Sequence, residues 1–239
     1  MADWREIESK VFMGVFRRTP LVLVRGEGSR VWDESGKQYL DFIAGWAVNS
    51  LGHCHPVVVD ALRRQAGTLI QTSNQFYTVP QLELAQLLVE NSALDRVFFT
   101  NSGAEANEGA IKLARKYGKT QLNGAYEVIR TLKSFHGRTL SMVAATGKPA
   151  YQKDFVPLPA GFQNVAFNDM DAIVKATSEK TCAILLEPIQ GEGGVNIPDD
   201  RYMADLRQFC SDKKLLLILD EVQTGVGRTG TMWGYQQFG

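Results

Sequence analysis

The sequence predicts an α/β fold built on a mostly parallel sheet, and two observations lead to this prediction. From about residue 51 onward, short runs of aliphatic and β-branched residues alternate with longer segments whose apolar residues recur at helical spacing. Clusters of glycine and polar residues follow directly after several of the apolar runs. Because ligands bind beyond the carboxyl ends of parallel strands, we expect the functional groups to gather at that edge of the sheet.

The expected elements follow from these patterns in chain order. Residues 30–42 predict a hairpin around a Glu-Ser-Gly-Lys turn, and Pro80 suits the first turn of a helix. A helix that begins near residue 104 is expected to end at Gly118, since glycine commonly terminates helices. The expected helices cover residues 55–69, 78–92, 104–118, 169–177 and 198–214. The expected strands cover residues 96–100, 126–132, 141–146, 182–188 and 215–223.

Composition and charge narrow the class of protein. The 239 residues are 44% hydrophobic and carry 26 basic and 26 acidic side chains, so the zero net charge gives no reason to expect a nucleic acid or an anionic membrane as partner. The scattered cysteines Cys54, Cys182 and Cys210 fit a reducing compartment better than a disulfide framework. No apolar run approaches the roughly 18 residues of a membrane-spanning helix, and the first residues lack the apolar core of a signal peptide. We therefore expect a cytoplasmic protein with one large domain, or one with a small subdomain.

Two clusters after expected strands could bind an anionic, aromatic ligand. Residues 102–104 are small and stand between a strand and a helix, where open backbone N–H groups and the helix dipole can bind a phosphate. A simple helix cap by Ser102 is an equally good interpretation. In the segment 134–139, Phe135 could offer a flat face to a ring, and Arg138 a planar fork to a carboxylate. Taken singly, core packing and a surface ion pair are the better explanations of these two side chains.

Other acidic and metal-like clusters carry weaker hypotheses. Glu187 and Glu192 lie on one loop after an apolar strand, but their spacing does not show that they face each other as an acid–base pair. Residues 52–56, Gly-His-Cys-His-Pro, have the density of a metal site, yet no second ligand cluster lies elsewhere, so no metal is expected. We expect His136 to be structural, because the sequence gives it no catalytic partner.

The stretch Leu215–Gly230 poses the central question, since an aliphatic strand runs directly into Asp220 and Glu221. A buried carboxylate is costly unless a cation or hydrogen-bond donors meet it. The glycines that follow match G-x-G-x-x-G, but a dinucleotide site needs them directly after the strand and an acid about 20 residues later, which this sequence does not provide. We therefore interpret Asp220 as the partner of a cation that arrives with a ligand. A protonated ring nitrogen fits, and together with the phosphate, ring and carboxylate contacts of the other clusters it describes pyridoxal phosphate.

Four segments, taken together, resemble a known family, the class III pyridoxal-phosphate-dependent aminotransferases. The segments are residues 101–115, 134–139, 187–194 and 220–230. Residues 28–56 are most similar to the acetylornithine aminotransferases within that family, and the resemblance extends from residue 16 to the end. It implies the type I fold of pyridoxal-phosphate-dependent transferases, with residues 1–50 as an N-terminal segment belonging to the small domain. Residues 51–239 are then a large cofactor-binding domain that is incomplete at its C-terminus.

The resemblance implies a role for each candidate site residue. The residues implied to contact pyridoxal phosphate are Ser102, Gly103, Ala104, Phe135, Asp220, Val222 and Gln223. In the family, the aspartate pairs with the protonated ring nitrogen. The phenylalanine and the valine pack on the two faces of the ring, and the glutamine bonds the phenolic oxygen. Arg138 is implied to receive the α-carboxylate of the substrate, and Glu192 to mask a second arginine until a dicarboxylate co-substrate enters.

The implied activity is transfer of the amino group of N-acetylornithine to 2-oxoglutarate, which yields glutamate, through pyridoxamine phosphate in a homodimer of the arginine biosynthesis pathway. Ornithine, succinyl-ornithine, succinyldiaminopimelate and 4-aminobutyrate remain alternative amino donors. The Schiff-base lysine of the family lies beyond the Asp220 motif, whereas the last lysine of this sequence is Lys214. We therefore expect an N-terminal fragment that is inactive alone, with a non-catalytic truncated chain as the rival hypothesis.

Overall fold

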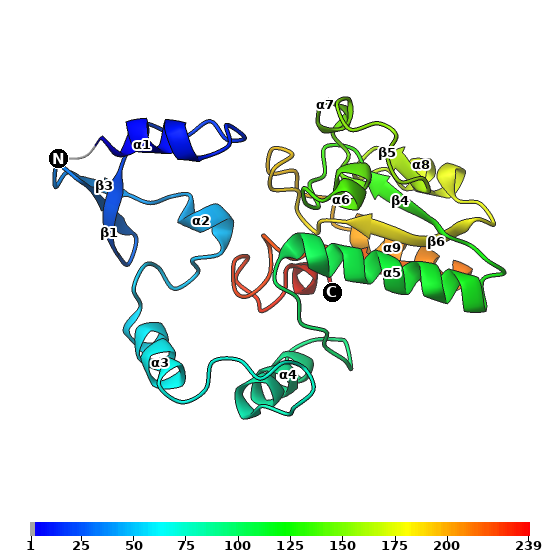
Figure 1. Ribbon diagram of the computed structural model, residues 1–239. Helices are drawn as coiled ribbons and strands as arrows, with labels where there is room; N and C mark the ends of the chain where they lie inside the picture. The colour runs from blue at the N-terminus through cyan, green and yellow to red at the C-terminus, as the bar shows by residue number, and fades with distance from the viewer. Residues whose placement is uncertain (1–2) are drawn as a thin grey trace. The chain divides into compact units, whose positions relative to one another are not determined.

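The computed structural model describes residues 3–239, which form two compact units (Figure 1). The first unit ends at Phe76 and the second is Tyr77–Gly239. The boundary between the two compact units therefore differs from the domain boundary expected between residues 50 and 51. That division concerns the domains of the whole protein and stays a prediction.

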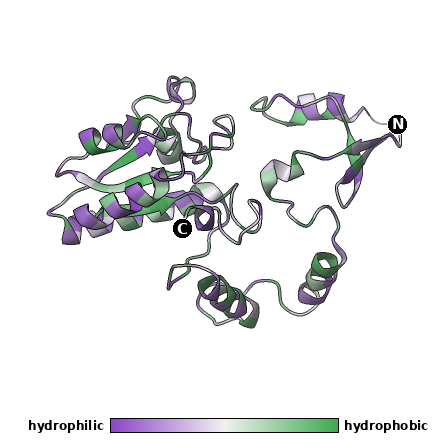
Figure 2. Cartoon of the chain, turned by 180° about the vertical axis from the view of Figure 1, so that it is seen from behind, coloured by the Kyte–Doolittle hydropathy of each residue, from purple (hydrophilic) through white to green (hydrophobic). Residues whose placement is uncertain are grey.

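The first unit is built around a small antiparallel sheet of order β1-β2-β3. Its elements are α1 Trp4–Val11, β1 Leu23–Glu27, β2 Arg30–Asp33, β3 Gln38–Leu40, α2 Ala44–Ala47 and α3 Pro56–Ala66. The expected hairpin is confirmed as β2 and β3, and the Asp33 carboxylate fixes its turn by accepting the backbone N–H groups of Ser35 (2.9 Å) and Lys37 (3.0 Å). Val31 is the one buried residue of this unit between residues 3 and 76. Local hydrogen bonds therefore define its shape more than a core does, and α3 exposes much of its apolar side (Figure 2).

The second unit contains a parallel sheet of order β5-β4-β6-β7, as the sequence predicts for an α/β fold. Its strands are β4 Glu127–Thr131, β5 Phe162–Val165, β6 Thr181–Leu186 and β7 Leu216–Leu219. Its helices are α4 Val79–Glu90, α5 Gly103–Gln121, α6 Leu140–Ala145, α7 Pro149–Gln152, α8 Met170–Ala176, α9 Tyr202–Lys213 and the 3-10 helix η1 Gly234–Phe238.

Helices cover both faces of this sheet, because successive side chains of each strand point to opposite faces. On one face, Val128 belongs to a core that includes Ile111 of α5 and Met142 of α6. On the other face, Ile129 belongs to a core that includes Leu206 of α9 and Ile173 of α8. Figure 2 shows hydrophobic and hydrophilic residues alternating along the helices of this unit, as expected for helices with one face on a sheet. With both faces covered, the ends of the strands are where a ligand can approach.

Two expected elements are wrong and one helix end is misplaced. Residues 96–100 form no strand, because no described segment pairs with them and Phe98 is 81% exposed. Residues 141–146 fall largely in helix α6 rather than in a strand, since the Thr139 hydroxyl caps the helix by accepting the Met142 N–H (3.4 Å) and an apolar run of this length suits either state. Helix α5 continues past Gly118 to Gln121. A side chain at Gly118 would collide with the carbonyl of Ala125, so this glycine permits close packing rather than ending the helix.

Within residues 3–239, the structure contains no helix that combines the length and the apolar character needed to cross a membrane.

Candidate active site

The candidate site lies at the carboxyl ends of β4, β6 and β7, beside the N-terminus of α5. The loops that follow these strands carry the segments 134–139, 187–194 and 220–230 singled out in the sequence. Since all these strands run parallel, their carboxyl ends share one edge of the sheet. Direct contacts among the loops, described below, bring all the motifs into one region of the second unit.

Asp220 is the centre of the site. It follows β7 directly, is only 6% exposed, and its backbone N–H donates to the Leu186 carbonyl (2.9 Å). Its Oδ2 accepts a hydrogen bond from Asn107 Nδ2 (2.8 Å) and another from the Nδ1–H of His136 (2.8 Å). Its Oδ1 accepts one described hydrogen bond, from the Val222 N–H (3.1 Å), so this oxygen keeps acceptor capacity for a further donor. The buried carboxylate is therefore held firmly while one of its oxygens can still take a proton-bearing partner.

His136 has the partner that the sequence does not show, while its structural role stays a prediction. Its side chain is fully buried, its backbone N–H donates to the Thr146 hydroxyl (3.0 Å), and its ring is fixed by Asp220. Because an ionised carboxylate only accepts hydrogen bonds, the bond to Asp220 places a proton on Nδ1. Asn107 completes the arrangement, since its amide also donates to the His136 carbonyl (3.0 Å). The sequence alone does not show these pairings, because His136 and Asn107 lie 84 and 113 positions from Asp220 along the chain.

Glu187 is a second buried acid in the same region, with 4% of its surface exposed. Its Oε2 accepts the Phe135 N–H (3.2 Å) and its Oε1 the Gly191 N–H (3.4 Å), so it ties together the loops after β4 and β6. Burial raises the pKa of Glu187 to about 7, and the neighbouring Asp220 charge acts in the same direction, while His136 opposes it. The described contacts include none between Glu187 and Glu192, so nothing in the structure supports an acid–base pair formed by these two residues.

The N-terminus of α5 meets two of the other loops. The Ser102 hydroxyl caps the helix by accepting the Glu105 N–H (3.2 Å), as the simpler of the two interpretations expected. A Cβ at Gly103 would stand 2.7 Å from Val222, and a Cβ at Gly137 would stand 2.7 Å from Ala104. Glycine at both positions thus allows the loops after β4 and β7 to close upon the first turn of the helix.

Gln223 reaches the loop after β6. Its side-chain Oε1 lies against Gly191, so a Cβ at that position would require the flexible Gln223 side chain to shift. Gln223 and Val222 therefore project from the loop after β7 toward different neighbours, one toward the loop after β6 and the other toward α5.

A cluster of rings and charges forms around Phe135. Its ring meets that of Tyr151 edge to face, with centroids 6.5 Å apart. The guanidinium of Arg138 and the ammonium of Lys148 lie 5.5 and 5.7 Å from the Phe135 centroid. Lys148 also donates to the main-chain carbonyl of Glu192 (3.0 Å), and its ammonium is 3.7 Å from Glu192 Oε2. Among the described residues, the cation beside Glu192 is thus a lysine that the sequence reasoning did not single out.

Glu221, the second acid of the opening question, has a different task from Asp220. Its Oε2 accepts the Thr224 hydroxyl (2.5 Å) and the Gly234 N–H (2.8 Å), and its Oε1 accepts the Tyr235 N–H (2.8 Å). These donors include the first N–H groups of η1, which favour a negative charge. Glu221 therefore holds the chain where it returns after the glycine-rich loop.

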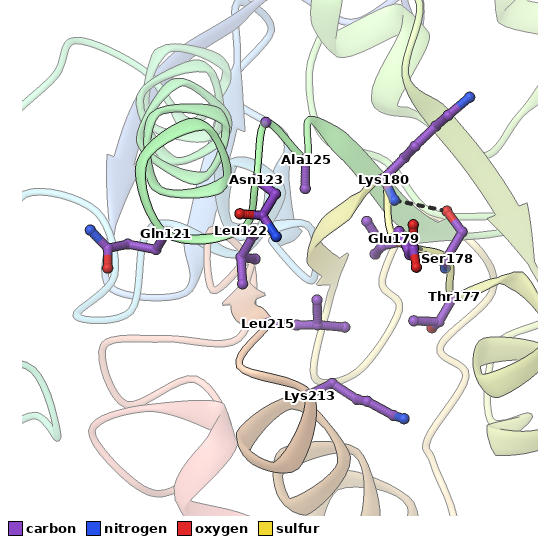
Figure 3. Close-up of a pocket in the computed structure, with 12 residues that line it drawn as sticks. Gln121, Leu122, Asn123, Ala125, Thr177, Ser178, Glu179, Lys180, Lys213 and Leu215 are labelled. Atoms are coloured by element: carbon purple, nitrogen blue, oxygen red, sulfur yellow. Dashed lines mark hydrogen bonds between the residues drawn. The ribbon is translucent and has the colours of Figure 1, made fainter.

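A cavity of about 760 Å³ lies at the opposite edge of the same sheet (Figure 3). It is lined by the residues that precede the strands, such as Ala125, Lys180 and Leu215, and none of the candidate site residues lines it. In Figure 3 the side chains of Lys180 and Lys213 extend away from the space between Leu122 and Leu215. Its charged lining residues are Glu179, Lys180 and Lys213, which belong to none of the motifs singled out in the sequence.

Comparison with known proteins agrees with this geometry. A family model described as Aminotransferase class-III matches residues 14–239. The acetylornithine aminotransferase of Methanocaldococcus jannaschii is 53% identical over 238 residues, which cover 99% of this chain and 60% of that protein. Acetylornithine aminotransferase 2 of Bordetella bronchiseptica is 48% identical over 236 residues, with coverage of 99% and 60%. The chain thus spans about 60% of the length of the curated relatives it matches.

Solved structures extend the comparison to the fold. The ornithine aminotransferase of Toxoplasma gondii ME49 superimposes with a TM-score of 0.95 at 34% identity, covering 99% of this chain and 57% of that one. The acetylornithine aminotransferase of Elizabethkingia anophelis gives a TM-score of 0.82 at 33% identity, with coverage of 98% and 56%. The matching family model spans nearly the whole sequence, and the motifs it shares meet at one strand edge. The chain belongs to the class III aminotransferases.

Proposed function

We propose that the complete protein transfers the amino group of N-acetylornithine to 2-oxoglutarate, as a step of arginine biosynthesis. The observation that carries the proposal is the buried Asp220 carboxylate, held by His136 and Asn107 beside the first turn of α5. Its side-chain donors come from other elements of the fold, and its Oδ1 accepts a single described hydrogen bond, so it has capacity for a further donor. The similarity to acetylornithine aminotransferases supports the choice of substrate.

The residues of the site fit pyridoxal phosphate, the cofactor of this family. Within residues 3–239, the N–H groups of Gly103 and Ala104 have no acceptor, as is usual in the first turn of a helix, so they can hold a phosphate. Asp220 Oδ1 can accept a hydrogen bond from a protonated ring nitrogen. Phe135 and Val222 are the side chains that would pack on the ring, and Gln223 would bond its phenolic oxygen.

Once bound, the cofactor supplies an electron sink for the bond that breaks at the substrate carbon. The chain's own contribution is to keep that sink charged. An anion within ~4–6 Å raises the pKa of a base by about 1–3 units, or roughly 1.4–4 kcal/mol in favour of the protonated form. Asp220 would hold a proton on the ring nitrogen in this way, and His136 and Asn107 keep its carboxylate in place.

Substrate contacts are proposed for Arg138 and Glu192. Arg138 presents a planar fork beside the Phe135 ring, which suits the α-carboxylate of an amino acid. Glu192 has a partly exposed carboxylate in the same cluster, which suits a role in distinguishing substrates by their charge. A homodimer in the cytoplasm is part of the same proposal, supported by the family and by the exposed apolar side chains of the first unit.

Ornithine is the second candidate donor, because the similarity of fold to the Toxoplasma gondii ornithine aminotransferase is high. Succinyl-ornithine, succinyldiaminopimelate and 4-aminobutyrate remain further donors to test. A chain retained for binding alone is the rival outside catalysis. This non-catalytic hypothesis is disfavoured because Asp220, Phe135 and Arg138 gather at one edge of the sheet, and a scaffold would need none of them.

The first experiment is to read the gene beyond the codon for Gly239 and express its complete product. The product, loaded with pyridoxal phosphate, is then assayed with each donor in turn and 2-oxoglutarate as acceptor. We expect the highest kcat/KM for N-acetylornithine. A higher value for ornithine moves the assignment to the second candidate, and no turnover with any donor rejects the aminotransferase proposal in favour of the non-catalytic one.

A further inference from the structure

The loop after β4 is anchored on both sides of Phe135. Ser134 is fully buried, and its hydroxyl accepts the Gly147 N–H (3.0 Å). The backbone N–H of His136 donates to the Thr146 hydroxyl (3.0 Å). Thr146 and Gly147 directly follow α6, so one segment of the chain holds both neighbours of Phe135.

The main chain of Phe135 itself has a separate anchor. Its N–H donates to Oε2 of Glu187 (3.2 Å), and Oε1 of the same carboxyl accepts the Gly191 N–H (3.4 Å). Glu187 is 4% exposed, so these hydrogen bonds form away from water, where they are stronger. The direction in which the Phe135 side chain leaves the main chain is therefore set by the loop after β6.

The ring of Phe135 follows its main chain closely. A phenylalanine side chain has two torsion angles, which are restricted to a few preferred rotamers. A change in the direction of the Cα–Cβ bond therefore moves the whole ring, and stacking on a flat ligand depends on the distance and tilt between the rings. The ring is half-buried, and its contact with the Tyr151 ring (6.5 Å between centroids) supports it from α7. Tyr151 thus supports the ring, while Glu187 holds the main chain from which it extends.

We propose that Glu187 is a positioning residue, which acts through the main chain of Phe135 to set its ring for stacking on the cofactor. The inference rests on the proposed function, since it takes the cofactor ring as the partner of Phe135. Because Ser134 and His136 keep their own anchors, loss of the Glu187 contact changes the direction of Phe135 and leaves the rest of the loop in place. The consequence is weaker cofactor binding with little loss of overall structure.

The test is a double-mutant cycle on cofactor binding by the complete protein. Glu187→Met keeps an unbranched side chain and removes both acceptor oxygens, and Phe135→Leu removes the ring. Binding of pyridoxal phosphate is measured by absorbance titration. We expect Glu187→Met to weaken binding about five- to tenfold in the wild-type background and less than about twofold in the Phe135→Leu background. A residue that acts through the ring has little effect once the ring is gone.

A second measurement does not depend on the cofactor. Hydrogen exchange followed by mass spectrometry reports on the peptide 133–138 in the cofactor-free protein. Exchange in this peptide should be faster in Glu187→Met, because the Phe135 N–H has lost its acceptor. If Glu187→Met does not fold, Glu187→Gln replaces it in both measurements, since its single amide oxygen cannot serve both N–H donors.

Gln190→Met is the matched control for loss of a buried polar contact between the same two loops. Gln190 is fully buried, and its amide donates to the Leu132 carbonyl (2.8 Å) without contacting the Phe135 N–H. This variant should change cofactor binding less than about twofold.

Equal weakening by Glu187→Met in both backgrounds would overturn the proposal, because the residue would then affect binding by a route other than the ring. Unchanged exchange of the peptide 133–138, or an equal loss of binding in Gln190→Met, would also overturn it. A wild type that binds no pyridoxal phosphate rejects the proposed cofactor and this role together. A wild type that binds it, with equal losses in the cycle, rejects this role alone.

Discussion

Glu187→Gln is expected to make the protein relatively more stable as the pH rises. The wild-type carboxyl is buried with its oxygens on the N–H groups of Phe135 and Gly191, and burial raises its pKa from 4.5 to about 7. Between these values the folded state keeps a proton that the unfolded state has lost. The stability that this proton provides is therefore complete below about pH 4.5 and is lost as the pH rises through about 7.

The size of the effect follows from the pKa difference. From 4.5 to about 7 is roughly 2.5 units, which corresponds to about 3.4 kcal/mol over the full range. Between pH 5 and pH 8, titration of Glu187 in the folded and unfolded states changes the free energy of unfolding by about 2.5 kcal/mol. Glutamine is neutral at every pH, so the variant lacks the dependence. Its amide also meets the Gly191 N–H less well, but that cost is the same at both pH values and cancels in the comparison.

The assay is thermal unfolding of both proteins at pH 5 and pH 8, at equal ionic strength and without cofactor. Relative to the wild type, Glu187→Gln should gain roughly 5–10 °C in Tm on going from the lower to the higher pH. Glu83→Gln, which removes an exposed glutamate from α4, controls for the loss of one surface charge and should change stability by less than about 0.5 kcal/mol. A difference between variant and wild type that stays constant from pH 5 to pH 8 would show that Glu187 does not retain its proton.

Three further changes test the proposed roles in the complete enzyme. Asp220→Ala should lower turnover roughly 10- to 1,000-fold, as expected from losing about 1–3 pKa units on the ring nitrogen, while the circular dichroism of the fold survives; near-normal turnover would reject the role. Arg138→Ala should raise KM for α-carboxylate substrates much more than for simple amines, and equal losses would argue against a carboxylate contact. Gly103→Ala should weaken pyridoxal phosphate binding, measured by absorbance titration, because its Cβ stands 2.7 Å from Val222. Adding Val222→Ala should restore part of that binding, and a loss without any such rescue would point to another cause.

The edge on which the site lies could be predicted from the sequence because the rule behind it is local. An apolar strand followed by polar or glycine residues marks the carboxyl end of the strand, and parallel strands place these ends together. The segments at 134–139, 187–194 and 220–230 were found in this way, and the structure brings them into contact. Their individual roles in binding a cofactor stay predictions.

The partners within the site could not be predicted, because they depend on contacts between distant parts of the chain. The sequence offers His136 no partner, yet in the structure its partner is Asp220, which follows the strand two places away in the sheet. Lys148 drew no attention because its neighbours Phe135 and Glu192 belong to different loops. Only His136 could have been recognised from the sequence. It is a polar ring next to Phe135 at the end of an expected strand, a position from which it can reach residues at the ends of the neighbouring strands.

The adjacent acids at the end of β7 show how the fold assigns different tasks to similar residues. Successive side chains leave an extended chain in opposite directions. Asp220 turns toward His136 and Asn107, whereas Glu221 turns toward the N–H groups of η1. The described donors to Glu221 all come from its own segment of the chain, Thr224, Gly234 and Tyr235. Asp220 is answered by side chains from two other elements and keeps one oxygen open. The two acids thus differ in the origin of their donors. Groups gathered from distant parts of the chain hold the Asp220 carboxylate in place, and this supports the proposal that Asp220, rather than Glu221, meets the cofactor.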